Sequence, residues 1–238
     1  MMKLAITGCQ GRMGQRIAQL ASRDKAFRIT ALIESPGRAD VPEKLFGVRV
    51  SRDINDIKGA DVLIDFTLPG PSIEALKACL KYGVRAVIGT TGFTDEQRSF
   101  ITKASRKIAL VQSTNMSVGV NLVFGLLSQM AVVLKGYDVE ITETHHVHKK
   151  DAPSGTAKTM AEVVEGVTRK KIKDIVSLRE GEVVGYHKVV FDGPVDTIEI
   201  VHNAKDREMF AAGALIAAKF LVRKDKGFYN MQQVLGLV

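Results

Sequence analysis

Short, almost continuous apolar runs alternate with amphipathic segments over the first 111 residues of the chain. In the segment 12–22, for example, the apolar residues Met13, Ile17, Leu20 and Ala21 fall on one face of a helix. Apolar strands that alternate with helices are typical of a parallel sheet covered on both faces, so the pattern predicts a Rossmann-type, doubly wound α/β domain. The predicted strands are 3–7, 28–33, 61–65, 84–88 and 107–111, and the predicted helices are 12–22, 72–81 and 95–105.

The pattern changes after residue 117. A long apolar segment at 118–134 predicts a helix, and residues 138–144 alternate apolar and polar positions, as in a strand with one solvated face. Two further strands, 188–191 and 197–201, flank a turn and predict an antiparallel hairpin before a last helix at 208–221. This half is therefore predicted to be an α+β domain with a mostly antiparallel open sheet. Such a sheet needs a cover, and self-association is the simplest one.

A glycine-rich loop, Gly8-Cys-Gln-Gly-Arg-Met-Gly14, joins the first predicted strand to the first helix. Glycines here let the backbone approach a pyrophosphate, whose negative charge the helix N-terminus favours. The spacing departs from the standard G-x-G-x-x-G, and a tight turn without a ligand is the alternative. We expect dinucleotide binding, with the guanidinium of Arg12 available to a phosphate oxygen. The predicted contacts in this loop are Gly8, Cys9, Gln10, Gly11, Arg12 and Met13.

Glu34 ends the second predicted strand, twenty residues after Gly14. A carboxylate at this place accepts hydrogen bonds from the ribose hydroxyls of NADH and repels the 2′-phosphate of NADPH. The position therefore favours NADH, although Arg38 could soften the preference. A solvated glutamate at a strand end is the alternative.

Two polar turns follow later strands of the predicted parallel sheet. Ligands of such sheets bind at the carboxyl ends of the strands, so residues there are candidates for contacts with the nicotinamide and its ribose. Turns with a purely structural role are the alternative. The candidates are Gly89, Thr90, Thr91, Ser113, Thr114, Asn115 and Met116.

The segment 143–157 carries three of the five histidines, His145, His146 and His148, followed by two lysines and a Ser-Gly-Thr turn. On a strand His146 and His148 would share one face, whereas in a turn all three could converge. Histidine donates a proton near neutral pH, lysine pairs with a carboxylate, and amides at a helix start bind anions. These features predict an anionic-substrate site with proton donors. A structural cluster and a zinc site are the alternatives, but the segment has no cysteine and no H-x-x-x-H pair.

Composition narrows the classes of function. The chain has 238 residues, of which 45% are hydrophobic and 25% charged, and no apolar run is long enough to predict a membrane span. Its two cysteines, Cys9 and Cys79, make neither a disulfide framework nor a metal pair and fit a cytoplasmic protein. The net charge of +8 favours an anionic partner, whereas few aromatic residues disfavour single-stranded nucleic acid. We expect a small-molecule anion, with no metal, membrane or nucleic acid.

Four motifs stand in order along nearly the whole chain. They are Gly8-x-x-Gly-Arg-Met-Gly14, Gly89-Thr-Thr-Gly92, Asn115-Met-Ser-Val-Gly-Val-Asn121 and Glu143-x-His-His-x-x-Lys-x-Asp-Ala-Pro-Ser-Gly-Thr-Ala157. Together they resemble the 4-hydroxy-tetrahydrodipicolinate reductase (dihydrodipicolinate reductase) family. The resemblance implies a cytoplasmic homotetramer that reduces 4-hydroxy-tetrahydrodipicolinate to tetrahydrodipicolinate with NADH or NADPH, in diaminopimelate and lysine biosynthesis. It also implies a dinucleotide-binding domain of residues 1–117 and 207–238 and a substrate-binding and tetramerisation domain of residues 118–206.

The resemblance also implies roles inside the histidine segment. His145 corresponds to the general acid of the family, and Lys149 to a proton donor or substrate anchor. His146, with the amides of Gly155 and Thr156, corresponds to the group that holds a substrate carboxylate. Hydride addition to a conjugated imine leaves a carbanion equivalent that must be protonated, which suits these donors.

Two positions depart from the family pattern. Ser35 stands where members that use NADPH often carry arginine, which favours NADH, and Tyr186 stands where the family often has glutamate. Two other classes of protein are the competing hypotheses. One is a nucleotide-sensing regulator that binds nucleic acid with its basic surface, and the other is a sugar or amino-acid dehydrogenase of similar plan. Sensing needs no proton donors, so the histidine segment favours the reductase.

Overall fold

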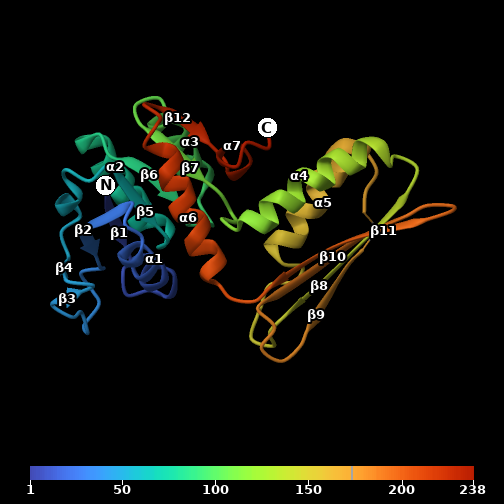
Figure 1. Cartoon of the computed structure of the whole chain (residues 1–238), viewed down its shortest axis with the longest axis horizontal. Coiled ribbons are helices and arrows are strands. Elements are labelled where there is room, and N and C mark those ends of the chain that lie inside the picture. The colour runs from blue at the N-terminus through green and yellow to red at the C-terminus, as the bar shows by residue number, and fades with distance from the viewer. Residues whose placement is uncertain (173) are drawn as a thin grey trace. The chain divides into compact units, whose positions relative to one another are not determined.

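The computed structural model describes residues 1–172 and 174–238, and the chain forms two compact units (Figure 1). The first unit contains Met1–Ser117 and Glu208–Gly236, and the second contains Val118–Arg207. The predicted fold class is confirmed: a Rossmann-type, mostly parallel sheet lies in the first unit and a mostly antiparallel sheet lies in the second.

The first unit is built on an eight-stranded sheet. Its strands are β1 (Met2–Thr7), β2 (Phe27–Ile33), β3 (Lys44–Leu45), β4 (Val48–Ser51), β5 (Val62–Asp65), β6 (Arg85–Ile88), β7 (Ala109–Gln112) and β12 (Gly227–Tyr229). Their order is β12-β7-β6-β5-β1-β2-β4-β3, and all neighbours are parallel except the hairpin of β3 and β4. Thr7 pairs with Asp65, so both lie at the carboxyl edge of the sheet.

Helices cover both faces of this sheet because alternate residues of its buried strands point to opposite sides. Leu4 and Ile6 pack in one apolar cluster with α1 and α6, and Ala5 and Leu63 pack in another with α2 and α3. The helices of this unit are α1 (Arg12–Arg23), α2 (Pro69–Tyr82), α3 (Asp95–Ala104), α6 (Glu208–Leu221) and α7 (Met231–Val234), with a 3-10 helix η1 (Ile54–Ile57).

Helix α6 returns the chain to the first unit through close backbone packing. A Cβ atom at Gly213 would lie only 1.7 Å from the carbonyl oxygen of Met116, so a side chain cannot be accommodated there. The neighbouring small residues Ala214, Ala217 and Ala218 are fully buried. This segment then leads to β12, which pairs with β7 at the edge of the sheet.

The second unit has a four-stranded sheet with two helices against one face (Figure 1). Its elements are α4 (Val118–Val133), β8 (Asp138–His145), α5 (Gly155–Thr168), β9 (Ile175–Arg179), β10 (Gly185–Asp192) and β11 (Thr197–Ala204). The order is β11-β10-β8-β9, antiparallel except for the pair β8–β9. Ile141, Val189 and Phe191 of the sheet pack in one core with Leu127 and Met160 of the helices.

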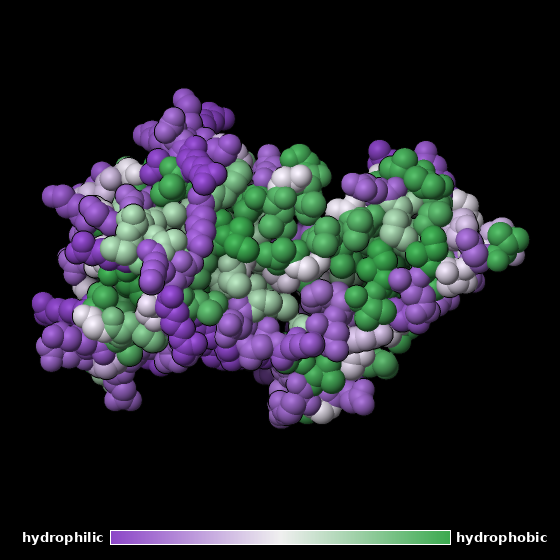
Figure 2. Space-filling view, in the orientation of Figure 1, coloured by the Kyte–Doolittle hydropathy of each residue, from purple (hydrophilic) through white to green (hydrophobic). Residues whose placement is uncertain are grey.

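Helix α4 is apolar on its outer side as well as its buried side. Leu122, Leu126 and Val133 are exposed, and Figure 2 shows hydrophobic residues over this helix. Even so, every helix in the described part of the chain is too short or too polar to cross a membrane.

Several short elements escaped the sequence prediction. The hairpin of β3 and β4 turns at Phe46 and Gly47, which both have positive φ, and its strands are too short for a period to appear. In β9 the apolar residues Ile175, Val176 and Leu178 do not alternate regularly with polar ones. The elements η1, β12 and α7 are likewise only three or four residues long.

Candidate active site

A pocket of about 790 Å³ opens at the carboxyl edge of the first unit's sheet. Of the predicted cofactor residues, Gly8, Gly11 and Glu34 line it. The side chains of Cys9 and Met116 are instead buried in the core of this unit, so only their backbone groups could meet a ligand. The lining residues are Thr7, Gly8, Gly11, Ile33, Glu34, Ser35, Pro36, Arg38, Arg52, Asp53, Ile54, Phe66, Thr67, Leu68, Pro71 and Glu74.

The glycine loop has the geometry that a pyrophosphate requires. Gly8 has a φ of +60°, in the left-handed region. A Cβ atom at Gly14 would lie 2.1 Å from the carbonyl oxygen of Gly8, so a side chain there would push α1 away from the loop. Gly11 precedes α1 and offers no side-chain cap to its first-turn amides, which leaves them suited to an anion. The loop therefore fits a dinucleotide.

Glu34 fastens this loop to the end of β2. Its side chain is only 6% exposed, and its two carboxylate oxygens accept hydrogen bonds from the amides of Gln10 (2.9 Å) and Ser35 (2.8 Å). Each carboxylate oxygen has a second lone pair, so Glu34 can also accept a ribose hydroxyl. Burial and the nearby Glu34 carboxylate raise the pKa of the Cys9 thiol to about 11, which excludes Cys9 as a nucleophile at neutral pH.

Two arginines border the same pocket. Arg38 and Arg52 both line it, and Nη2 of Arg52 donates to the carbonyl oxygen of Arg38 at 2.9 Å. Arg52 had not been singled out from the sequence, because it follows a strand too short to predict. These guanidiniums place positive charge on the pocket that Glu34 also lines.

A buried carboxylate organises the ends of three neighbouring strands. Asp65, at the end of β5, is 2% exposed and accepts hydrogen bonds from the hydroxyls of Thr7 (2.6 Å), Thr67 (2.7 Å) and Thr90 (2.8 Å). The hydroxyl of Thr90 also accepts from the Thr67 amide at 2.9 Å. The predicted cofactor residue Thr90 is thus held by Asp65, which the sequence analysis missed. The feature of the sequence that could have indicated Asp65 is an acidic residue at the end of an otherwise apolar strand.

The other predicted turns are compact. A Cβ atom at Gly89 would lie 2.3 Å from the ring of Phe66, so the turn after β6 needs glycine there. In the turn after β7, the Ser113 hydroxyl donates to the carbonyl oxygen of Asn115 at 2.7 Å, and Oδ1 of Asn115 accepts from the Ser117 amide at 2.9 Å. The Asn115 side chain therefore closes its own turn.

In the second unit the three clustered histidines separate because β8 ends at His145. His145 is 9% exposed and points into the unit. His146 lies beyond the strand, and its Nε2 accepts a hydrogen bond from Nη2 of Arg207 at 3.3 Å. His148 is exposed beside Glu182, at 3.6 Å. The cluster therefore contains one buried histidine and two in other environments.

His145 is paired with a fully buried carboxylate. Nδ1 of His145 contacts Oε2 of Glu143, and Oε1 of Glu143 accepts hydrogen bonds from the Ser154 amide and from Nη1 of Arg179, both at 3.1 Å. Burial alone would raise the pKa of Glu143, but the hydrogen bond with His145, followed by smaller effects of the Ser177 side chain and the Ser154 amide, brings it below its ordinary value. Burial lowers the pKa of His145, against the opposing effect of Glu143. His145 is thus held near an acid that stays ionised.

A second buried histidine lies against this pair. The rings of His145 and His187 meet edge to face at 5.2 Å, and Nε2 of His187 lies 3.2 Å from the hydroxyl of Ser154. Burial, with smaller effects from the charges of His145 and His202, lowers the pKa of His187 to about 4. His187 is therefore neutral at physiological pH. The sequence pattern does not indicate a role for His187, because strand pairing brings it here from β10.

The loop after β8 carries Lys149 to the start of α5. Nζ of Lys149 pairs with Oδ1 of Asp151 at 2.9 Å, and a cis peptide joins Ala152 to Pro153. Ser154 then caps α5 by accepting the amide of Ala157 at 3.2 Å. The predicted substrate residues Gly155 and Thr156 form the first turn of this helix, next to the Glu143–His145 pair.

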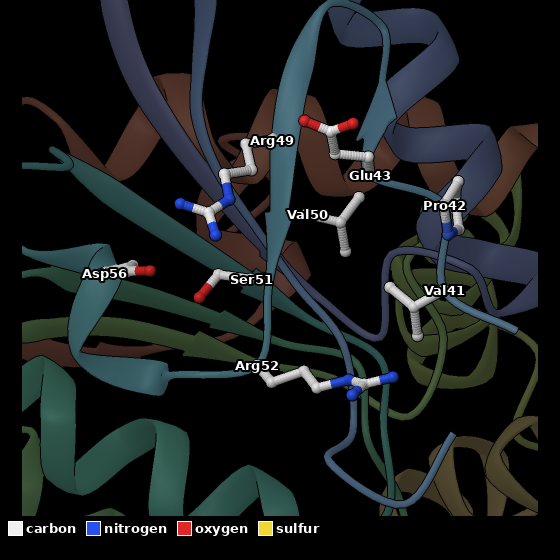
Figure 3. Close-up of a pocket in the computed structure, with 8 residues that line it drawn as sticks. All are labelled: Val41, Pro42, Glu43, Arg49, Val50, Ser51, Arg52 and Asp56. Atoms are coloured by element: carbon white, nitrogen blue, oxygen red, sulfur yellow. The ribbon is translucent and has the colours of Figure 1, made fainter. Parts of the chain in front are cut away.

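A third feature is a pocket of about 440 Å³ beside β4 (Figure 3). Figure 3 shows Arg49 and Glu43 toward one end of it and Arg52 toward the other. Its charges are mixed, and we assign it no chemistry. Within residues 1–172 and 174–238, no group of three histidine, cysteine or acidic side chains is arranged to hold a metal ion.

Both halves of the chain match models of one family. Residues 2–116 match the model described as dihydrodipicolinate reductase, N-terminus, and residues 119–235 match dihydrodipicolinate reductase, C-terminus. A 4-hydroxy-tetrahydrodipicolinate reductase of Nitrosomonas europaea is 41% identical, over 99% of this chain and 98% of the relative. The enzyme of the same name from Citrifermentans bemidjiense is 40% identical, over the full length of both chains.

A solved structure agrees with these matches. The dipicolinate-bound dihydrodipicolinate reductase of Paenisporosarcina sp. TG-14 superimposes with a TM-score of 0.87 and 26% identity, over 98% of each chain. A probable dehydrogenase of Thermotoga maritima, 10% identical with a TM-score of 0.68, shares the fold alone. The two family models and the full-length relatives show that this chain belongs to the dihydrodipicolinate reductase family.

Proposed function

We propose that this reductase converts 4-hydroxy-tetrahydrodipicolinate to tetrahydrodipicolinate with NADH or NADPH, in diaminopimelate and lysine biosynthesis, and that His145 and Lys149 serve the protonation. The observation that carries the residue assignment is the buried Glu143–His145 pair beside the N-terminus of α5. This pair supports the assignment because a buried histidine held by a carboxylate lies beside helix amides that suit an anion.

The substrate is a dicarboxylate, and the solved relative carries dipicolinate, which is also a dicarboxylate. In our proposal His146 and the amides of Gly155 and Thr156 hold one carboxylate, with Lys149 as the charged anchor. Arg207 supports this placement because its guanidinium already donates to Nε2 of His146. Positive charge thus gathers where the substrate charge is negative.

The chemistry divides between cofactor and protein. A bound nicotinamide supplies hydride, and the glycine loop, Glu34 and the turns after β6 and β7 are the groups proposed to hold the dinucleotide. His145 contacts Glu143 through Nδ1, so the proton that its imidazolium releases is the one on Nε2. A Cβ atom at Gly185 would lie 3.1 Å from this Nε2, so glycine leaves the nitrogen room. His145 can therefore protonate the carbanion equivalent that hydride addition leaves on the substrate.

NADH is the proposed preferred cofactor. Glu34 is buried at the end of β2 with its carboxylate fixed by two amides, and a fixed negative charge there disfavours a 2′-phosphate. Arg38 and Arg52 on the same pocket offset part of that repulsion, so NADPH is accepted more weakly rather than rejected.

We further propose a cytoplasmic homotetramer that associates through the open face of the second unit's sheet. A row of paired residues, Val201, Lys188, Thr142 and Val176, crosses all four strands on the side away from Ile141. Val176, Val201 and the neighbouring Leu178 are about half exposed (50%, 50% and 47%), and an apolar open face favours association.

The direct test supplies purified protein with the condensation product of aspartate semialdehyde and pyruvate and follows NADH absorbance. We expect oxidation that depends on this product, with a lower KM for NADH than for NADPH. Absence of product-dependent oxidation with either cofactor would refute the proposed function. Light scattering after size-exclusion chromatography tests the tetramer separately.

A further inference from the structure

The guanidinium of Arg179 binds both the partner of His145 and the loop that carries Lys149. Strand β9 runs parallel to β8 and places Arg179 opposite His145. Besides Nη1, which reaches Glu143, its Nη2 donates to the carbonyl oxygen of Asp151 at 2.6 Å, and Nε donates to that of Lys149 at 3.3 Å. Nη1 also donates to the carbonyl oxygen of Leu178 at 2.6 Å, so one side chain holds four acceptors that lie in three segments.

Glu143 is the link between this guanidinium and the acid. It has no exposed surface, and its oxygens serve different partners: Oε2 meets His145, while Oε1 takes Arg179 and the Ser154 amide. A buried carboxylate without positive partners is strongly unfavourable, so Arg179 and His145 stabilise it together. Movement of any one of these groups disturbs the others.

We propose that Arg179 and Glu143 are positioning residues of the reaction. Glu143 fixes the ring of His145 so that Nε2 serves the substrate, and Arg179 holds Glu143 and the Lys149 loop in one arrangement. This inference rests on the role of His145 in the proposed function. The position requires arginine because its planar fork presents donors in several fixed directions, whereas a lysine ammonium is a single point of charge.

The charges around His145 predict the direction in which its pKa should change when either positioning residue is replaced. The groups that face its ring are Glu143 on its own strand, Lys149 in the following loop, Arg179 on β9 and His187 on β10. The Glu143 carboxylate favours the imidazolium, and the cations oppose it. Loss of the Glu143 charge therefore lowers the pKa of His145, and loss of the Arg179 charge raises it.

The test compares Glu143→Gln, Arg179→Met and Arg179→Lys by NMR of histidine-labelled full-length protein. In Glu143→Gln the pKa of His145 should fall, and its ring should no longer be fixed as the Nδ1–H tautomer. In Arg179→Met the pKa of His145 should rise. In Arg179→Lys the pKa should stay near that of the wild type, because the charge is kept. For Glu143→Gln we expect kcat to fall about 100-fold, at the lower end of what general acid catalysis contributes.

Arg179→Lys keeps the positive charge but removes the planar guanidinium, so it distinguishes the effect of the hydrogen bonds from that of the charge. It loses the hydrogen bonds to the Lys149 loop, so KM for the substrate should rise about tenfold, the scale of one hydrogen bond, with a smaller change in kcat. The matched control is Lys171→Gln, which removes the positive charge of an exposed lysine that pairs with Glu165 in the same unit. It should change neither the His145 titration nor KM.

Two results would overturn the proposal. One is a His145 pKa that moves in the same direction in Glu143→Gln and Arg179→Met, and the other is an Arg179→Lys protein with wild-type KM. If Arg179→Met does not fold, the His145 pKa in Glu143→Gln and the KM of Arg179→Lys still test the proposal. The titration uses no substrate, so its result stands even if the wild-type protein fails to reduce the proposed substrate, and the two failures are distinguishable.

Discussion

In each unit we propose that an anion binds at the start of a helix, and the two helix starts are built with opposite chemistry. In the first unit Gly11 precedes α1 without a side-chain cap, and the loop works because side chains are absent. In the second unit Ser154 caps α5 with its hydroxyl, and its amide binds the buried Glu143. The first site depends on bare backbone, whereas the second depends on a network of charged and titratable side chains.

The two sites should therefore fail in different ways. All five histidines of the chain lie in the second unit, while the proposed cofactor site of the first unit consists of glycine geometry and one fixed carboxylate. Steric substitutions should damage the first site, and changes of protonation should damage the second.

Removal of the proposed acid is the largest expected effect. His145→Gln should lower kcat by about 10²- to 10⁴-fold, the range that general acid catalysis contributes, because glutamine cannot supply the proton that the imidazolium releases from Nε2. Affinity for NADH, measured by fluorescence titration, should be unchanged, since the glycine loop is untouched. His148→Gln, an exposed neighbour, is the control and should retain activity. An equal loss of NADH binding in His145→Gln would contradict the separation of the sites.

Acid should next destabilise the second unit selectively. The unfolded chain protonates His187 as pH falls through 6.5, but the folded chain does so only near 4, so the unfolded state binds more protons between these values. The contribution of His187 to the free energy of unfolding is thus fully present above pH 6.5 and is lost as the pH falls toward 4. The loss is about 3 kcal/mol, at 1.36 kcal/mol per pKa unit.

Hydrogen exchange at pH 7 and pH 5 measures this effect region by region. Exchange should accelerate in β8 and β10 and stay nearly constant in β1 and β5. His187→Gln should reduce the pH dependence and leave the smaller part that comes from His145 and His202, because burial lowers the pKa of both. Uniform acceleration in both units would mean that the loss of stability does not arise from His187.

The sequence predicted the fold well and the second site only in part, for a physical reason. The periods of 3.6 and 2 residues are local, so the long helices and strands were visible in the pattern. Glu143, Arg179 and His187 converge through the pairing of β8 with β9 and β10, which no local pattern encodes. The histidine motif indicated His145 as a candidate, but its partner and the support of that partner depend on sheet register.

The first site shows the same division. The glycine spacing and Glu34 were visible because a Rossmann turn is local, and the structure places both on one pocket. Asp65 is not indicated by the sequence because two of its three threonine partners, Thr7 and Thr90, come from distant segments of the chain. Arg52 follows a four-residue strand that gives no periodic signal.

Steric change in the glycine loop should weaken the first site alone. In Gly14→Ala the added Cβ would lie 2.1 Å from the Gly8 carbonyl oxygen, so the loop or α1 must shift. Such overpacking costs about 1–3 kcal/mol, which predicts a loss of NADH affinity of up to about 100-fold if the strain falls on the binding loop. Gly70→Ala, which meets open space, is the matched control. Calorimetric titration with dipicolinate should give the wild-type affinity for Gly14→Ala, and a parallel loss there would show that the sites are not independent.

The smallest expected effect concerns the choice of cofactor. Glu34→Gln keeps the size of the side chain and one acceptor for the Gln10 or Ser35 amide but removes the negative charge that disfavours a 2′-phosphate. Because Arg38 and Arg52 remain on the pocket, the ratio of NADPH to NADH affinity should rise about tenfold, the effect of roughly 1.4 kcal/mol. The rise should shrink in high salt, where exposed guanidiniums are screened, and Arg52→Gln should reverse part of it. An unchanged ratio at low salt would mean that Glu34 serves only to fasten the loop, and the first site would then select its cofactor by shape alone.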